Sequence, residues 1–399
     1  MDFLSFFGSH EDLVKKTLPK PIIASSCIPL CKPYITAEEE KAVAEVLRSG
    51  WLMQGPKVEE FERLVAEYAG VKHAVSVNSG TSALTIAYAA AGLPAGRGAI
   101  MPSHSFVATA NTAVHNGLTP IFVDIKRNQY NIDPSKIEPA ISKNACALVV
   151  VHQIGIPADM TPIMKVAKKH KLVVLEDAAC SIGATYGGRQ TGGFGEIACL
   201  SFHPRKVITT GEGGMLLTNS DQAAQLARSL RNHGLTQDDS STPIRCKSAG
   251  YNYRMTDVQA AIGIVQFKKL DEIIRLRTRL AARYQEEISR LPALRLPEWP
   301  KGAVPNFQSF VVEALDEKIS RDLLLRHMNE RGIESKPGIQ PIHNEPAYAG
   351  SVRDADLPET MRAAGRSFFL PLYPGMTDDD QTLVLQVLKE ATEINGRAR

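Results

Sequence analysis

The chain has 399 residues, of which 44% are hydrophobic and 22% charged, enough for about two to three domains of roughly 150 residues around a large buried core. Its 46 basic and 43 acidic residues nearly balance to a net charge of +3, and no basic run stands out, so nucleic acid is not an expected partner. The sequence has no long apolar run, no secretory signal and no C-x-x-C cysteine pair, so we expect a cytoplasmic protein without a membrane span, a zinc site or a disulfide scaffold.

Residues 1–28 show no periodicity, and we predict that they form an N-terminal arm. Thr36 followed by Glu39 is a capping box, which predicts a helix start. The dipeptides Asp133-Pro134 and Thr161-Pro162 each predict another helix start, with an N-cap residue before proline.

Between these helices lie short apolar runs, which predict strands. They are Ala74–Val77, Gly98–Met101, Pro120–Val123, Ala147–His152, Leu172–Leu175, Ile197–Phe202 and Met215–Thr218. Strands that alternate with helices and are apolar almost throughout indicate a mostly parallel sheet covered on both faces. We therefore predict an α/β fold with three layers, α/β/α.

Thr256 predicts the N-cap of a long helix that continues to about Leu291. After it, a strand at Gln308–Glu313, a helix at Ile319–Glu330 and a final helix from Thr377 indicate a smaller α+β unit. The predicted division is thus a large domain at 29–270 and a small C-terminal domain at 271–399.

Three segments place polar side chains at the carboxyl ends of predicted strands, where sheets of this type bind ligands. Asn78–Ser82 is a turn of small residues that begins a helix and could cradle a phosphate. Glu176-Asp177 ends a strand, and Ser201–Lys206 brings a lysine to the same edge. Singly, each has an ordinary interpretation, namely a helix cap, a solvated acid and a surface lysine.

Together the three segments supply what pyridoxal 5′-phosphate (PLP) needs from a protein. The helix start would bind its phosphate. Asp177 would pair with the ring nitrogen and favour its protonated form. Lys206 would bond covalently to the aldehyde carbon as a Schiff base.

The sequence resembles the DegT/StrS family of sugar aminotransferases from Ile28 onward. The motifs that support this resemblance are Ser49–Leu52 with Gly55-Pro56, Asn78–Leu84, Ala108–Asn111, Val151-His152 with Gly155, Glu176–Ala179, Ser201–Gly214 and Gly250–Met255. The resemblance implies the fold of PLP-dependent transferases of fold type I. It also implies an enzyme that moves an amino group from glutamate, released as 2-oxoglutarate, to a ketosugar.

The resemblance also implies a role for individual residues. Lys206 matches the lysine that bonds to the cofactor, Asp177 the partner of its ring nitrogen, and Phe106 a residue that stacks on its ring. The residues that match phosphate contacts are Gly80, Thr81 and Ser201. Asn252 matches an asparagine that reaches the phosphate from the neighbouring subunit, which implies a homodimer with shared active sites.

Two residues depart from the family pattern. Cys180 stands near the expected position of the cofactor's ring hydroxyl, where glutamine, glutamate or histidine is frequent, and a thiol is a weaker hydrogen-bonding group. Met53 stands where a small hydroxyl residue is frequent beside the substrate, so we expect a substrate pocket of a different shape.

The expected acceptor is a nucleotide-linked 4-keto-6-deoxy sugar, which would become an amino sugar for a cell-surface polysaccharide or a natural product. A cyclitol or a keto sugar acid is the alternative acceptor, and a non-catalytic regulator that keeps the fold is the alternative class. Four further residues have both a functional and a structural interpretation: His152, Arg231, His343 and Tyr348.

Overall fold

The computed structural model describes residues 27–142, 144–236, 243–315 and 319–397. Residues 1–26, most of the expected N-terminal arm, lie outside this range. No helix in the described part of the chain combines the length and apolar composition that crossing a bilayer requires.

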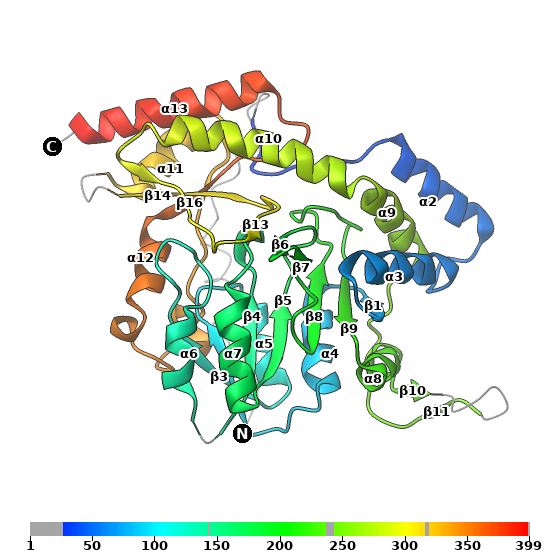
Figure 1. Cartoon of the computed structure of the whole chain (residues 1–399). Helices are drawn as coiled ribbons and strands as arrows, with labels where there is room; N and C mark the ends of the chain where they lie inside the picture. The colour runs from blue at the N-terminus through cyan, green and yellow to red at the C-terminus, as the bar shows by residue number, and fades with distance from the viewer. Residues whose placement is uncertain (1–26, 143, 237–242, 316–318, 398–399) are drawn as a thin grey trace, which may run out of the picture.

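A seven-stranded sheet forms the centre of the molecule, in the order β1-β9-β8-β5-β4-β2-β3 (Figure 1). Its strands are β1 (His73–Val77), β2 (Gly98–Pro102), β3 (Thr119–Val123), β4 (Ala145–Val151), β5 (Val173–Asp177), β8 (Ile197–Ser201) and β9 (Gly214–Thr218). Strand β9 is antiparallel to both of its neighbours, and all other neighbouring pairs are parallel. The apolar runs therefore predicted all seven strands to within two residues, and the mostly parallel sheet is confirmed.

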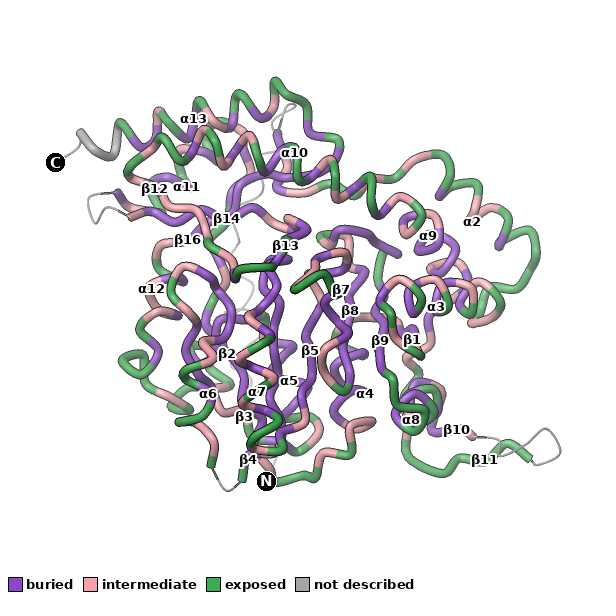
Figure 2. The backbone as a smooth tube through the Cα atoms, viewed as in Figure 1, coloured by how far each residue is buried: buried purple, intermediate pink, exposed green. Residues whose placement is uncertain are grey.

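Helices cover both faces of this sheet. They are α3 (Pro56–Ala69), α4 (Gly80–Ala90), α5 (Ala108–His115), α6 (Pro134–Ala140), α7 (Met160–His170), α8 (Asp221–Arg231) and α9 (Asp257–Lys268). Because successive side chains of a strand point to opposite faces, Ala147 and Val149 of β4 pack with α4, α5 and α8, whereas Leu148 and Val150 pack with α6 and α7. The sheet is consequently the most continuously buried part of the chain (Figure 2).

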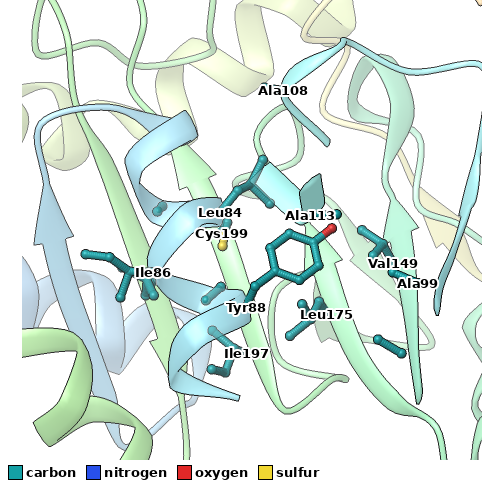
Figure 3. Close-up of a cluster of buried hydrophobic side chains, with 14 of the residues drawn as sticks. Leu84, Ile86, Tyr88, Ala99, Ala108, Ala113, Val149, Leu175, Ile197 and Cys199 are labelled. Carbon is teal, nitrogen blue, oxygen red and sulfur yellow. The ribbon is translucent and has the colours of Figure 1, made fainter. Parts of the chain in front are cut away.

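The cluster beneath α4 fixes this helix against the sheet (Figure 3). Tyr88 is fully buried there among Leu84, Leu175 and Ile197. Its hydroxyl donates a hydrogen bond to the backbone carbonyl of Thr109 (3.1 Å), so a buried polar atom is satisfied. This contact ties α4 to α5, the two helices that begin at the carboxyl edge of the sheet.

Most helix starts follow the predicted caps. Helix α2 (Ala37–Ser49) has the Thr36 capping box, α6 is capped by Asp133, and α9 by Thr256. The prediction at Thr161 was wrong, because α7 already begins at Met160. The hydroxyl of Tyr186 contacts Thr161 Oγ1 (3.0 Å) and its backbone N–H (3.4 Å), which gives the first turn a partner from another segment.

The expected single helix after Thr256 is two helices. Helix α9 ends at Lys268 and α10 (Leu270–Ile288) follows, with Lys269 between them in a non-helical conformation. Lys269 Nζ donates to Thr36 Oγ1 (2.6 Å) and to Glu39 (3.1 Å) of the α2 cap. A contact with a distant segment therefore accompanies this break, and local sequence does not indicate it.

The C-terminal part forms a second apolar core. A four-stranded antiparallel sheet consists of β12 (Leu294–Arg295), β14 (Phe310–Ala314), β16 (Ser367–Leu370) and β15 (Lys336–Pro337). Helices α10, α11 (Arg321–Glu330) and α13 (Asp378–Arg397) pack on it. Ile28 belongs to the same core and pairs with Ile333, so the chain before α2 lies against this unit.

Short elements complete the described chain. They are β6 (Thr185–Tyr186), β7 (Arg189–Gln190), β10 (Leu235–Thr236), β11 (Arg245–Cys246), β13 (Ala303–Val304), α12 (Pro358–Arg366), and the 3₁₀ turns η1 (Gln153–Gly155), η2 (Ile342–Asn344), η3 (Pro346–Tyr348) and η4 (Asp354–Asp356). Strand β13 pairs with β6. This contact connects the segment between β12 and β14 with the segment between β5 and β8.

Candidate active site

The candidate site lies at the carboxyl edge of the central sheet, where three strands bring their ends together. Asp177 ends β5 beside Cys199 of β8, and β8 ends at Ser201. The end of β8 pairs with Gly214, which also pairs with Val77 at the end of β1. The three segments predicted from sequence therefore converge on one edge.

The segment after β1 begins α4 with a tightly packed turn. Ser79 caps the helix, and its Oγ accepts the N–H of Ser82 (3.0 Å). A Cβ at Gly80 would lie 2.7 Å from Cβ of Ser201, so only glycine fits beside that strand end. The first N–H groups of a helix have no intrahelical acceptor, and Thr81 is exposed there, which makes this turn a candidate phosphate cradle.

Asp177 is 6% exposed and accepts hydrogen bonds on both carboxylate oxygens. Thr109 Oγ1 donates to Oδ2 (2.8 Å), and the N–H of Ala179 donates to Oδ1 (3.3 Å). Ser105 Oγ in turn contacts Thr109 Oγ1 (2.8 Å). Among the described residues, no lysine, arginine or histidine forms an ion pair with this carboxylate. A buried acid with so few partners favours a cationic ligand group.

Lys206 follows β8 in a turn in which its N–H donates to the carbonyl of His203 (2.8 Å). Its Nζ donates to Sγ of Cys180 (3.1 Å), three residues beyond Asp177. Both side chains are only partly buried. The amine therefore lies at the same edge as Asp177 and remains accessible to a ligand.

Phe106 and Asn252 lie at the border of this edge. Phe106 precedes α5 and is 73% exposed, an unusual exposure for a phenylalanine. Asn252 is exposed and forms a bridge with Asn232. The carbonyl of the next residue, Tyr253, accepts the N–H of Asn78, so this segment lies beside the α4 turn of its own chain (2.9 Å).

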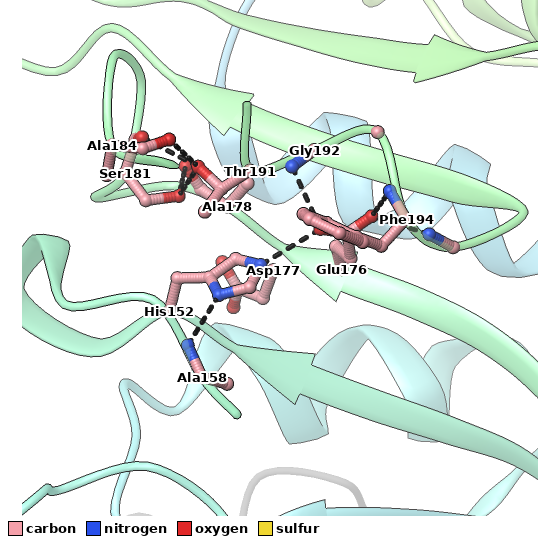
Figure 4. A network of polar contacts seen from close by, with 12 residues as sticks. His152, Ala158, Glu176, Asp177, Ala178, Ser181, Ala184, Thr191, Gly192 and Phe194 are labelled. Atoms are coloured by element: carbon pink, nitrogen blue, oxygen red, sulfur yellow. Dashed lines mark hydrogen bonds and ion pairs between the residues drawn. The ribbon is translucent and has the colours of Figure 1, made fainter. Parts of the chain in front are cut away.

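His152 has a structural role rather than a ligand contact (Figure 4). Its Nδ1 accepts the N–H of Ala158 (3.0 Å), so Nε2 carries the proton and donates to Glu176 (2.9 Å). Both side chains are fully buried. Burial raises the pKa of Glu176, but hydrogen bonds from His152 and from the N–H groups of Gly195 and Gly192 lower it overall. Glu176 thus anchors the loop at 192–195.

The other residues with two interpretations also have internal partners. His343 is 3% exposed and contacts Ser103 Oγ (2.6 Å) through Nδ1. Arg231 is buried and donates to Glu62 and to the carbonyl of Ser76 (2.8 Å). Tyr348 donates to Asn111 Oδ1 (2.6 Å). These contacts favour the structural interpretation of all three residues.

Met53 lies in the loop between α2 and α3 and is 58% exposed. The loop is held by Asp257, which accepts the N–H groups of Gly55 (2.8 Å) and Val58 (3.1 Å) on Oδ1. The N–H of Asp257 points back to the carbonyls of residues 52 and 53 (3.2 and 3.3 Å). Met53 is therefore presented on a loop with a fixed backbone.

Sequence reasoning missed the residues that hold the site from outside. Thr109 lies in the motif Ala108–Asn111, which was a signal without an assigned role. Asn306 Nδ2 donates to the carbonyls of Cys180 (2.9 Å) and Ile182 (2.8 Å), and Gln308 donates to the carbonyl of Arg205 (2.7 Å). No sequence pattern indicates the last two residues.

The donor set of this edge fits PLP. A helix start closed by Gly80 and Ser201 suits its phosphate, Asp177 suits a protonated ring nitrogen, and Lys206 is an accessible amine. No cluster of metal-ligating side chains occurs in the described ranges. The fold and this edge together define a PLP-dependent aminotransferase.

The chain belongs to the DegT/DnrJ/EryC1/StrS aminotransferase family, whose profile matches residues 33–389. It is 37% identical over 375 residues to the spore coat polysaccharide biosynthesis protein SpsC of Bacillus subtilis (strain 168), covering 91% of this chain and 96% of that protein. It is 36% identical over 367 residues to the GDP-perosamine synthase of Caulobacter vibrioides, covering 91% and 98%.

Among solved structures, PseC of Helicobacter pylori, an aminotransferase involved in the biosynthesis of pseudoaminic acid, superimposes with a TM-score of 0.88. The two chains are 28% identical, and the match covers 92% of this chain and all of that one (100%). The family, the fold and the class of enzyme expected from sequence are thereby confirmed. The roles of the individual site residues stay predictions.

Proposed function

We propose that this protein transfers an amino group from L-glutamate to a ketosugar, with a nucleotide-linked 4-keto-6-deoxy sugar as the acceptor. The observation that best supports the proposal is that an accessible amine, Lys206, lies at the same sheet edge as a buried carboxylate, Asp177, which has no cationic partner among the residues that the structure describes. The relatives named for perosamine and pseudoaminic acid support an amino sugar as the product.

PLP, when bound, supplies an electron sink that stabilises negative charge on the substrate carbon. Asp177 would hold a proton at the ring nitrogen, and Thr109 would keep its carboxylate in place. The N–H groups of Gly80 and Thr81 and the hydroxyl of Ser201 would bind the phosphate. The cofactor ring would stack on Phe106 and cover this exposed side chain.

Lys206 would do the proton chemistry. Its Nζ would hold the cofactor and, with glutamate bound in its place, would be a free amine. That amine would accept a proton from the substrate carbon and later give it back, as general base and acid. Cys180 lies within hydrogen-bonding distance of Nζ (3.1 Å) and would hold the free amine near this position.

The test of this chemistry uses full-length protein loaded with PLP and the variant Lys206→Ala. We expect the visible absorbance of the bound cofactor to disappear with L-glutamate in the wild type and in the control Lys301→Ala, an exposed lysine before β13. Lys206→Ala should transfer no nitrogen. Transfer at the wild-type rate by that variant would refute the proposed role.

The acceptor is tested on the amine-loaded form of the protein. Ketosugars with and without a nucleotide, a keto-cyclitol and a keto sugar acid are added separately, and return of the absorbance is followed. We expect return only with the nucleotide-linked 4-keto-6-deoxy sugars. Return with the cyclitol or the sugar acid alone would contradict the proposed acceptor.

We also propose that Asn252 completes the site of a partner subunit in a homodimer. Large apolar side chains exposed on the loop before α3 and beside Asn252 support such an interface: Trp51 (53%), Leu52 (45%), Met53 (58%) and Tyr251 (38%). Mixing Lys206→Ala with Asn252→Ala should restore activity, because a mixed dimer contains one intact site. If the mixture stays as inactive as its parents, Asn252 acts within its own chain.

A further inference from the structure

The contact between Cys180 and Lys206 joins two nucleophiles. Sγ and Nζ lie 3.1 Å apart, and neither side chain is fully buried, so a small oxidant can reach the sulfur. Peroxide oxidises cysteine sulfur to a sulfenic acid, and an amine in contact with that sulfur is placed to attack it. The pair is therefore reactive in a way that neither residue is alone.

The backbones on both sides of this contact are held by the same short loop. Asn306 donates to the carbonyl of Cys180 (2.9 Å), and Gln308, two residues later, donates to the carbonyl of Arg205, the neighbour of Lys206 (2.7 Å). Gln308 is itself fixed by the Asn306 side chain, which accepts its N–H (2.9 Å). The backbone segments that carry the sulfur and the amine are thus held by the same buried residues.

We propose that hydrogen peroxide converts this pair into a covalent sulfur–nitrogen bond. In the first step, the thiol of Cys180 and one peroxide give a sulfenic acid and one water, and sulfur loses two electrons to the oxidant. In the second step, the lone pair of Lys206 Nζ attacks the sulfur, the S–O bond breaks, and hydroxide leaves with the amine's proton as a second water. The product is a sulfenamide, which two equivalents of a thiol reduce back to thiol and amine with formation of a disulfide.

This modification would regulate the site, because the bonded nitrogen of Lys206 is unavailable to a cofactor. Bond formation itself requires only the observed contact and the peroxide. Protection of the pair by PLP rests in addition on the proposed function, in which Nζ is bonded to the cofactor. Cofactor-free protein should consequently be the form that peroxide modifies.

The test treats full-length protein with hydrogen peroxide, once loaded with PLP and once freed of it, and then alkylates the remaining thiols. Peptide mass mapping should find the Cys180 and Lys206 peptides joined and two hydrogens lighter than their sum in the cofactor-free sample. Dithiothreitol should separate them again. Cys180→Ser should lose this product.

A matched control is Cys146→Ser. Cys146 is also partly buried, but burial raises the pKa of its thiol, which disfavours the thiolate. This variant should form the linked product like the wild type. Alkylated or over-oxidised Cys180 without any linked peptide in the cofactor-free wild type would overturn the proposal. Equal linkage with and without PLP would leave the bond established and instead contradict the bond between Lys206 and the cofactor.

Discussion

The packing of Gly80 against Ser201 allows a quantitative test of the phosphate cradle. In Gly80→Ala the new methyl group would lie 2.7 Å from Cβ and 3.3 Å from Cα of Ser201. Ser201 cannot simply move away, because it ends a central strand and pairs with Gly214. A Cβ on Gly214 would itself lie 2.3 Å from the carbonyl oxygen of Ser79, so the neighbourhood has no free space.

Overpacking of this kind costs about 1 to 3 kcal/mol. If the α4 turn shifts to relieve the clash, the binding free energy of the phosphate should weaken by a similar amount. Each 1.4 kcal/mol is about tenfold in affinity. We therefore expect PLP to bind roughly five- to 150-fold more weakly to Gly80→Ala than to the wild type. The unfolding temperature of the cofactor-free protein should also fall.

The assay is a titration of cofactor-free protein with PLP, combined with thermal unfolding. Gly365→Ala is the matched control, because Gly365 lies near the end of α12 and a Cβ there would meet nothing within 4 Å. That exchange should leave PLP affinity unchanged and stabilise the helix by up to about 1 kcal/mol. If Gly80→Ala binds PLP as tightly as Gly365→Ala, the cradle is not formed by this turn.

Three further predictions concern the support of the site and the fold. Thr109→Val removes a hydrogen bond to Asp177, which should lower the free energy of unfolding by about 1.5 to 3 kcal/mol. Thr109→Ser keeps the hydroxyl and should not lower it. Equal denaturant midpoints for the two variants would contradict this prediction. Burial lowers the pKa of His104 to about 4. The unfolded chain binds a proton at this histidine near pH 6.5, before the folded protein does. The free energy of unfolding should therefore fall as the pH drops from about 6.5 to 4, by at most about 3 kcal/mol. His104→Phe should remove that part of the pH dependence, and an unchanged profile would refute the prediction. Arg231→Met leaves the buried carboxylate of Glu62 without its cation and should cost about 3 to 5 kcal/mol, whereas Glu62→Gln combined with Arg231→Met should recover part of it in denaturant unfolding.

The sequence was sufficient to predict the large sheet, and it brings the candidate site residues to one edge of it. Short, near-continuous apolar runs that alternate with helical segments indicate strands buried on both faces, and the carboxyl ends of parallel strands meet at one edge. That reasoning alone brings Asp177 and Lys206 together. The break at Lys269 escaped it, because the lysine binds Thr36 and Glu39 more than 200 residues away in the chain.

The roles of the buried histidines could not be read from sequence, because a strand-end histidine looks the same whether it binds a ligand or a loop. For His152 the deciding fact is that both ring nitrogens are used, one by Ala158 and the other by Glu176. The N–H groups that complete the environment of Glu176 come from residues 192–195. The sequence around a histidine does not indicate which distant groups will bond to its two ring nitrogens.

The contacts that position Lys206 could not be predicted from sequence either, because they link residues that lie far apart in the chain. Gly155 has a φ of +87°, and a Cβ there would lie 1.8 Å from Oδ1 of Asn306, so glycine is required for Asn306 to approach. Asn306 in turn holds the carbonyl of Cys180, 126 residues away, and Cys180 contacts the amine of Lys206. Gly155 belongs to a family motif although it has no chemistry of its own, and close approach of Asn306 is the physical reason. A glycine in a motif without a ligand role therefore indicates a distant backbone or side chain that must pass close to it.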